Sequence, residues 1–266
     1  MIAWLLLACA SKAPQSRLEE ARRRLDANDL VGARAAYDLV LANHPDEIDA
    51  LIGRGWALLL LDEGPQARKD FERCRVNAPR EAECLRGIAS VVAATGNTIY
   101  AKTLLDQALE LEPGDPKVRS SQALLAVKRG ELDTARTLYE GLVADVPDEV
   151  GYQLGLGEVA LRQGRLDDAR RIVDEAEART GVGVRTRGML QILRARILLD
   201  DAEARTRSGC ADVDRARADV AEAIQVLDRL RADTVPLPQV DALRASATDR
   251  HNTIDSACPV GTISDR

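Results

Sequence analysis

Apolar and small residues recur along this chain with the spacing of α-helices, and polar residues occupy most positions between them. The pattern itself repeats, because an alanine returns every 34 residues, at Ala33, Ala67, Ala101, Ala135 and Ala169. A second small residue stands twelve positions before each alanine, at Ala21, Gly55, Ala89, Ala123 and Gly157. Small residues at such fixed positions allow packed helices to cross closely, since larger side chains would force the helices apart.

Other positions of the repeat predict where the helices end and what lies between hairpins. A proline follows the alanine by twelve residues in four repeats, at Pro45, Pro79, Pro113 and Pro147. Proline ends the second helix because it lacks a backbone N–H and excludes the preceding residue from helical geometry. Gly96, Gly130 and Gly164 are predicted to end the first helix in the left-handed conformation. A large residue four positions after the alanine is predicted to fill the space between successive hairpins, at Tyr37, Phe71, Leu105, Tyr139 and Val173.

This signature resembles the tetratricopeptide repeat, a unit of about 34 residues that folds as two antiparallel helices. The resemblance implies an all-α protein, a right-handed superhelical solenoid of antiparallel hairpins with a concave face. It divides the chain into five units, at 14–47, 48–81, 82–115, 116–149 and 150–183.

The rest of the chain leaves the strict repeat. Residues 184–232 are predicted to form a longer capping pair of helices, with a break at Ser208-Gly209. Such a cap shields the last apolar surface of a solenoid. Pro236 and Pro238 break the helical pattern, so 233–266 is predicted to be a mostly irregular tail containing at most a short amphipathic piece.

Composition supports helix and narrows the class of partner. The chain is 45% hydrophobic but only 3% aromatic, and it has a net charge of −6. Few aromatic strand formers are therefore present. General nucleic-acid binding is not expected, because it needs a basic surface.

The N-terminal segment carries a candidate lipidation site. Residues 1–8 are apolar and too short for a transmembrane helix, which needs about 20 residues. Leu6-Leu7-Ala8-Cys9 resembles the bacterial lipobox. The resemblance implies that 1–8 is a signal segment, that lipidated Cys9 begins the mature chain, and that 9–13 is a short linker. Ala10 and Ser11 resemble an outer-membrane sorting signal. The alternative is an apolar segment that caps the first hairpin.

Four further cysteines are Cys74, Cys84, Cys210 and Cys258, which allow three pairings. The repeat geometry favours Cys74 with Cys84, since both lie equally far from the turn at Pro79, and leaves Cys210 with Cys258. The alternative is four buried free thiols. No pair has C-x-x-C spacing, so no metal or other cofactor is expected.

The resemblance places binding residues on the first helix of each unit. The candidates are Asp49, Trp56, Arg86, Ser90, Lys117, Ser121, Lys128, Glu158 and Arg162. Trp56 is a candidate anchor because tryptophan is enriched at binding hot spots. Arg86, Lys117 and Lys128 are predicted to form a modest positive strip suited to an acidic or C-terminal peptide. The glycines Gly53, Gly87 and Gly155 leave room either for a ligand backbone or for helix packing.

No catalytic motif is present, so the chain is predicted to be a non-catalytic scaffold that binds a protein or peptide. The lipobox favours a lipid-anchored envelope protein on the periplasmic side of the outer membrane. It would resemble the tetratricopeptide lipoproteins that help to assemble envelope machines. Two alternatives stay open: a soluble cytoplasmic adaptor, and an accessory subunit of a peptidoglycan-related envelope enzyme.

Overall fold

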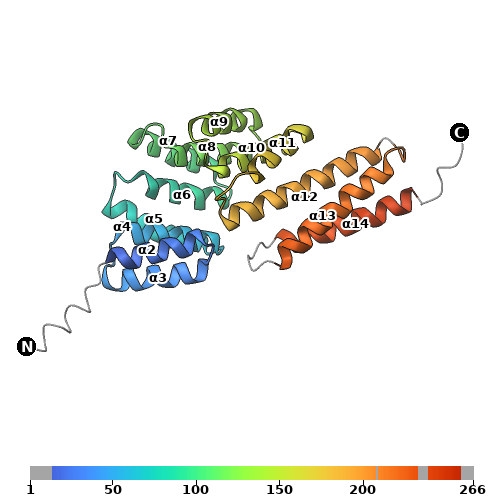
Figure 1. Ribbon diagram of the computed structural model, residues 1–266. Helices are drawn as coiled ribbons and strands as arrows, with labels where there is room; N and C mark the ends of the chain where they lie inside the picture. Colours follow the sequence, from blue (N-terminus) through green and yellow to red (C-terminus); the bar gives the residue numbers. More distant parts are fainter. Residues whose placement is uncertain (1–13, 208, 233–238, 259–266) are drawn as a thin grey trace, which may run out of the picture. The chain divides into compact units, whose positions relative to one another are not determined.

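The computed structural model describes residues 14–207, 209–232 and 239–258, which contain thirteen α-helices and no strand (Figure 1). The prediction of an all-α fold is therefore confirmed. The helices are α2 (Pro14–Asp26), α3 (Leu30–Asn43), α4 (Ile48–Leu60), α5 (Gly64–Asn77), α6 (Ala82–Ala94), α7 (Thr98–Leu111), α8 (Pro116–Arg129), α9 (Leu132–Asp145), α10 (Val150–Arg162), α11 (Leu166–Glu177), α12 (Val184–Arg207), α13 (Val213–Ala232) and α14 (Gln239–Ala257).

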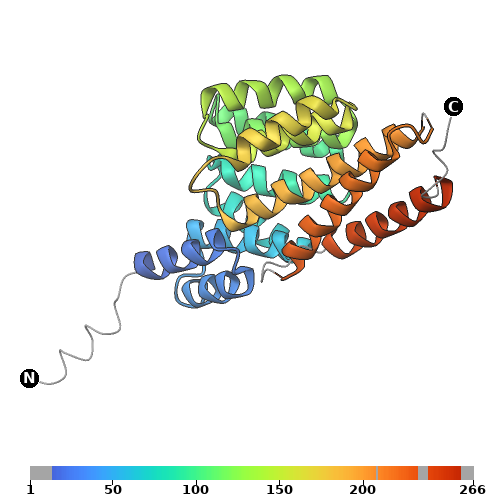
Figure 2. The same ribbon diagram turned by 45° about the vertical axis from the view of Figure 1, so that its right-hand side comes forward.

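The chain forms two compact units, residues 1–138 and 139–266, and the division falls within α9. In the first unit each odd-numbered helix packs against the helix before it, which gives the hairpins α2–α3, α4–α5 and α6–α7. The first helices of successive hairpins also contact one another, α2 with α4, α4 with α6 and α6 with α8 (Figure 2). This is the stacking of a tetratricopeptide-like solenoid.

The small residues of the repeat lie in the core. All five repeat alanines are 0% exposed, from Ala33 to Ala169. Their partners twelve residues earlier are also buried, including Gly55 and Gly157. Since no side chain larger than a methyl group stands at these positions, the two helices of a hairpin can approach closely.

The large residue of the repeat fills a space that a glycine leaves open in the next hairpin. A Cβ atom added at Gly53 would lie 2.1 Å from the Tyr37 ring, and one at Gly87 would lie 2.3 Å from the Phe71 ring. In the second unit Gly155 stands against Tyr139 in the same way, at 2.4 Å. These glycines therefore serve helix packing, which was one of the two roles that the sequence allowed.

Replacing Gly87 by alanine should destabilise the first unit by about 1–3 kcal/mol, because the new methyl group overlaps the fully buried Phe71 ring. The matched control is Gly64→Ala, whose new Cβ would have Val91 at 3.9 Å as its nearest neighbour. Hydrogen exchange of α4 to α6 measures the two changes. Equal stability of the two variants would contradict this account of the packing.

The helix ends follow the predicted residues. α3, α5, α7 and α9 each end two residues before a proline. The predicted glycines Gly96, Gly130 and Gly164 have positive φ angles of 89°, 77° and 72°. Asn28 and Asp62 hold the same repeat position with φ of 60° and 62°. These two residues were not among the predicted helix ends, although asparagine and aspartate are the residues that best tolerate this conformation after glycine.

The second unit ends in three helices that pack together. α12 packs against α13, and α14 packs against α13 and α12. The prediction of a mostly irregular tail over 233–266 differs from this, because α14 occupies nineteen of those residues. Val240, Ala247 and Ile254 recur every seven residues and are buried against the other two helices. Because so few apolar residues mark the buried side of this helix, its amphipathic pattern in the sequence is weak, and the sequence wrongly predicted an irregular tail.

Two disulfides join cysteines within the units. Cys74 at the end of α5 bonds to Cys84 in α6, with 5.7 Å between their Cα atoms. Cys210 bonds to Cys258 with a Cα separation of 5.8 Å. The second bridge closes a long loop and ties the end of α14 to the start of α13. Arg217 adds an ion pair with Asp255 at 2.8 Å to the same junction.

None of the described helices combines the length and the apolar character that crossing a membrane requires.

Candidate protein-binding groove

A groove of about 410 Å³ opens on the first unit. Its residues come mainly from the first helices of the hairpins, α2, α4, α6 and α8, and from the turns that lead into α6 and α8. The lining consists of Arg22, Leu25, Tyr37, Asp49, Ile52, Gly53, Trp56, Glu81, Glu83, Glu112, Asp115 and Lys117. An apolar strip and a set of charged groups therefore share one concave surface, as in many ligand sites.

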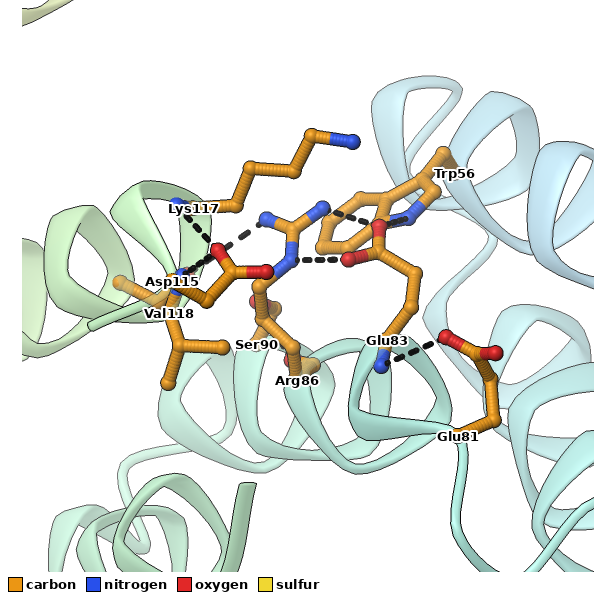
Figure 3. Close-up of polar contacts among 9 residues, drawn as sticks. Trp56, Glu81, Glu83, Arg86, Ser90, Asp115, Lys117 and Val118 are labelled. Atoms are coloured by element: carbon orange, nitrogen blue, oxygen red, sulfur yellow. Dashed lines mark hydrogen bonds and ion pairs between the residues drawn. The ribbon is translucent and has the colours of Figure 1, made fainter. Parts of the chain in front are cut away.

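Trp56 is held in place from three sides. Its ring lies edge-on to the Phe71 ring, with 5.2 Å between centroids. Its indole Nε1 donates a hydrogen bond to Glu83 Oε1 at 2.8 Å. The Arg86 guanidinium stacks over the ring at 4.1 Å and also donates to Glu83, through Nε at 2.7 Å (Figure 3). Cation–π contact and ion pairing thus fix the indole on the groove wall.

Two of the groove carboxylates are helix caps. The Glu81 side chain accepts a hydrogen bond from the Glu83 N–H at the start of α6. Asp115 accepts from the N–H groups of Lys117 and Val118 at the start of α8, at 2.6 and 3.1 Å. A carboxylate is stable at a helix N-terminus because it binds free N–H groups and faces the positive end of the dipole.

Glu112 has no such role, although it stands beside both caps. It is the C-cap residue of α7, where its backbone N–H bonds to Ala108. Glu112 is an exposed residue. Partial burial of its carboxyl raises the pKa, as do the hydrogen bond to Asp115 and the negative charges of Asp115, Glu81 and Glu83. Negative charge therefore accumulates at this end of the groove.

Some of the binding residues predicted from the sequence line the groove of the first unit, and others do not. Asp49, Trp56 and Lys117 line the groove. Arg86 is not among the lining residues; it stacks on Trp56 and donates a long hydrogen bond to the Ser121 hydroxyl, at 3.5 Å. Two further candidates do not line the groove and bond to backbone carbonyls: Ser90 donates to the Arg86 carbonyl and Lys128 to the Ala93 carbonyl, at 3.0 and 3.5 Å.

The groove does not show the positive strip expected from Arg86, Lys117 and Lys128. Arg86 is ion-paired with Glu83 and is only 16% exposed in its side chain. The lining contains five carboxylates and two cations, and one of those cations, Arg22, is itself paired with Asp49 at 2.6 Å. The prediction overlooked this pairing, although Glu83 and Arg86 lie three residues apart on one helix, a spacing at which opposite charges meet.

The last two candidates belong to the second unit. Arg162 donates to Glu158 at 2.7 Å, and Arg196 of α12 pairs with the other oxygen of the same carboxylate. This ion-paired cluster is a solvated face of α10 and α12.

Several groove residues were missed by the sequence reasoning. They are Arg22, Leu25, Tyr37, Ile52, Glu81, Glu83, Glu112 and Asp115. One signal was available, since acids recur every 34 residues at the N-caps of the first helices, at Glu47, Glu81, Asp115 and Glu149. The position of Glu112 beside them depends on the turn between α7 and α8.

Two further predictions from the sequence concern metal binding and lipidation. In the parts of the chain that the structure describes, no group of three or more His, Cys, Asp and Glu side chains is placed to hold a metal ion. Cys9, the predicted lipidation site, lies outside the described residues.

Stacked hairpins with a mixed polar and apolar groove define a helical-repeat protein of the binding class. The family model described as tetratricopeptide repeat matches residues 18–82 and 120–181. The chain is a tetratricopeptide repeat protein. This family consists of scaffolds that are typically non-catalytic and that bind proteins or peptides.

Relatives extend this assignment only at the level of fold and family. The cellulose synthase operon protein C of Pseudomonas fluorescens is 27% identical over 191 residues, which are 64% of this chain and 15% of that protein. The chain thus spans a small part of that relative. A tetratricopeptide repeat protein from Parabacteroides merdae superposes with a TM-score of 0.63 at 18% identity, covering 88% of this chain and 84% of that one. PilW, a type IV pilus biogenesis factor, superposes with a TM-score of 0.56 at 15% identity, covering 88% and 99%.

Proposed function

We propose that the first-unit groove binds an extended segment of a protein partner and that the chain works as a lipid-anchored scaffold in the bacterial envelope. The observation that carries the binding half is the groove itself, because it presents Trp56, Ile52 and a ring of charged groups on one concave surface. Trp56 is its natural anchor, since a rigid aromatic side chain gives large contact area at little entropic cost.

Replacing Trp56 by alanine should weaken peptide binding by about 30-fold, the effect of losing a hot spot of about 2 kcal/mol. The ligands are peptides taken from a randomised display library by selection for binding to the full chain, kept in detergent. Fluorescence anisotropy of the labelled peptides measures their affinity. The matched control is Tyr100→Ala, an aromatic on α7 that is 40% exposed and does not line the groove. If circular dichroism shows that both variants are folded and their peptide affinities are equal, the binding site lies elsewhere.

The anchoring half of the proposal rests on Cys9 and on the disulfides. A lipobox-like sequence precedes Cys9. The two disulfide pairs suit an oxidising compartment, since such bonds rarely persist in the cytosol of most organisms. More than one acyl chain, as bacterial lipoproteins carry, would hold the protein stably at a membrane.

Intact-mass spectrometry of the protein from its native host tests this half. The expected mass corresponds to a chain that begins at Cys9 with added acyl groups. Alkylation should modify Cys74, Cys84, Cys210 and Cys258 only after reduction. An unacylated chain that retains residues before Cys9 and alkylates without reduction would overturn the envelope assignment and favour a cytoplasmic adaptor.

A further inference from the structure

The charged groups of the groove are unequally balanced. Asp49 and Glu83 each have an arginine partner, Arg22 and Arg86. Among the described residues, Glu81, Glu112 and Asp115 form no ion pair within 4 Å. Figure 3 shows Glu81 on one side of the Trp56–Glu83–Arg86 cluster, and Asp115 and Lys117 on the other side.

Helix capping accounts for two of these carboxylates but not for the third. Glu81 and Asp115 have a structural role at their positions, because the side chain of each caps a helix. Glu112 adds a negative charge where two are already present; burial raises its pKa most, and the neighbouring carboxylates raise it further. The other hairpins of the first unit have His44 and Ala78 at the equivalent position, so the fold itself does not require an acid there.

An apolar surface lies alongside the carboxylates. Ile52 and the Trp56 ring line the same groove, and Gly53 is packed against the Tyr37 ring. The groove therefore offers both a contact area for an aliphatic stem and a negative end for a charged head. Arginine and lysine side chains combine these two properties, since their apolar stems pack while their charged heads stay hydrated or paired.

The chain already illustrates this contact. Arg86 lays its guanidinium on the Trp56 ring and gives its N–H groups to a carboxylate. A guanidinium is planar and weakly hydrated, so it suits an aromatic face beside an acid. A metal ion fits less well, because no described group of three acidic or histidine ligands is arranged to hold one.

Building on the proposed function, we infer that the groove takes a cationic segment of its partner, an arginine- or lysine-bearing stretch whose charge is received by Glu81, Glu112 and Asp115. The groove thus selects partners by charge, the opposite sign from the one that repeat position suggested. Charge complementarity of this kind acts on both partner choice and association rate.

The test neutralises the three carboxylates without removing the caps, in the variant Glu81→Gln, Glu112→Gln, Asp115→Asn of the full chain. Amide oxygens can still accept the capping hydrogen bonds. The control variant neutralises three exposed carboxylates of the first unit that do not line the groove, Glu72→Gln, Glu110→Gln and Glu131→Gln. The ligands are again peptides selected from the randomised display library, and anisotropy measures their affinity at low and at high salt.

The selected peptides should be enriched in arginine and lysine. The triple groove variant should bind them about tenfold more weakly, because exposed ion pairs are individually weak but here act together. The control should change affinity by less than about twofold, and high salt should weaken binding to the wild type. If the triple groove variant fails to fold, Glu112→Gln alone replaces it, since Glu112 caps its helix only through its backbone, and should weaken binding about threefold.

Two other outcomes overturn the inference in distinguishable ways. If neutral or acidic peptides are selected, and their binding depends on Trp56 but not on the three carboxylates, the cationic ligand is wrong and the proposed groove stands. If no selected peptide depends on Trp56 or on the carboxylates, the proposed groove fails and the inference fails with it.

Discussion

Replacing Arg54 by methionine is expected to destabilise the first unit by about 3 kcal/mol, the lower range for breaking a buried ion pair. Arg54 of α4 donates to both oxygens of Asp70 of α5, through Nε at 2.7 Å and Nη2 at 2.6 Å. The Asp70 side chain is only 7% exposed, so the substitution leaves its charge buried without a partner. Hydrogen exchange of α4 and α5 measures the loss.

Two further variants test whether the loss of stability comes from the buried charge of Asp70. Asp38 also pairs with Arg54, at 2.8 Å, but its side chain is 51% exposed, so Asp38→Asn should cost at most about 1 kcal/mol. Adding Asp70→Leu to Arg54→Met removes the buried charge and should restore much of the stability. A double variant as unstable as Arg54→Met alone would show that packing, and not charge, explains the loss.

Replacing Phe71 by alanine is expected to destabilise the same unit by about 3–5 kcal/mol, as found for buried aromatic side chains. Phe71 is 0% exposed, and its ring lies against both Gly55 and Gly87. Neither glycine has a side chain that could move into the space, so the cavity should persist. The loss should also free Trp56, which packs edge-on against the same ring.

The measurement is again hydrogen exchange, because repeat arrays unfold in stages and a single melting temperature is poorly defined. Protection should fall in α4, α5 and α6. The control is Leu39→Ala, since Leu39 is 62% exposed on α3 and should contribute little. A Phe71→Ala protein as stable as this control would contradict the role assigned to the aromatic–glycine contacts.

Much of the fold was predictable because the residues that pack the helices together recur at the same positions in every repeat. A buried alanine, a large residue four positions later and a proline near the helix end recur in phase, and each has one steric reason. Helix α14 escaped the prediction because its buried residues, Val240, Ala247 and Ile254, stand seven residues apart, with Leu243 partly buried between the first two. Its place is fixed by contacts with α12 and α13 that no local pattern encodes.

The candidate site was predictable in position but not in charge. Repeat position predicted Asp49, Trp56 and Lys117 for the concave face, and these three residues line the groove. The sign of the surface depends on which charges cancel, and that is decided by side-chain pairs such as Arg22 with Asp49, 27 residues apart. The acidic contribution of Glu112 depends on a turn that brings it to Asp115. Both are contacts between elements, so the sequence pattern alone could not supply them.

The central claim is that this tetratricopeptide protein binds its partner in the first-unit groove. Hydrogen exchange of the full chain, with and without a saturating selected peptide, tests it most directly. Protection should increase in α4 around Trp56 and at the starts of α6 and α8, where Glu83 and Lys117 lie. Protection confined to α5 and α7, or to the second unit, would contradict the claim.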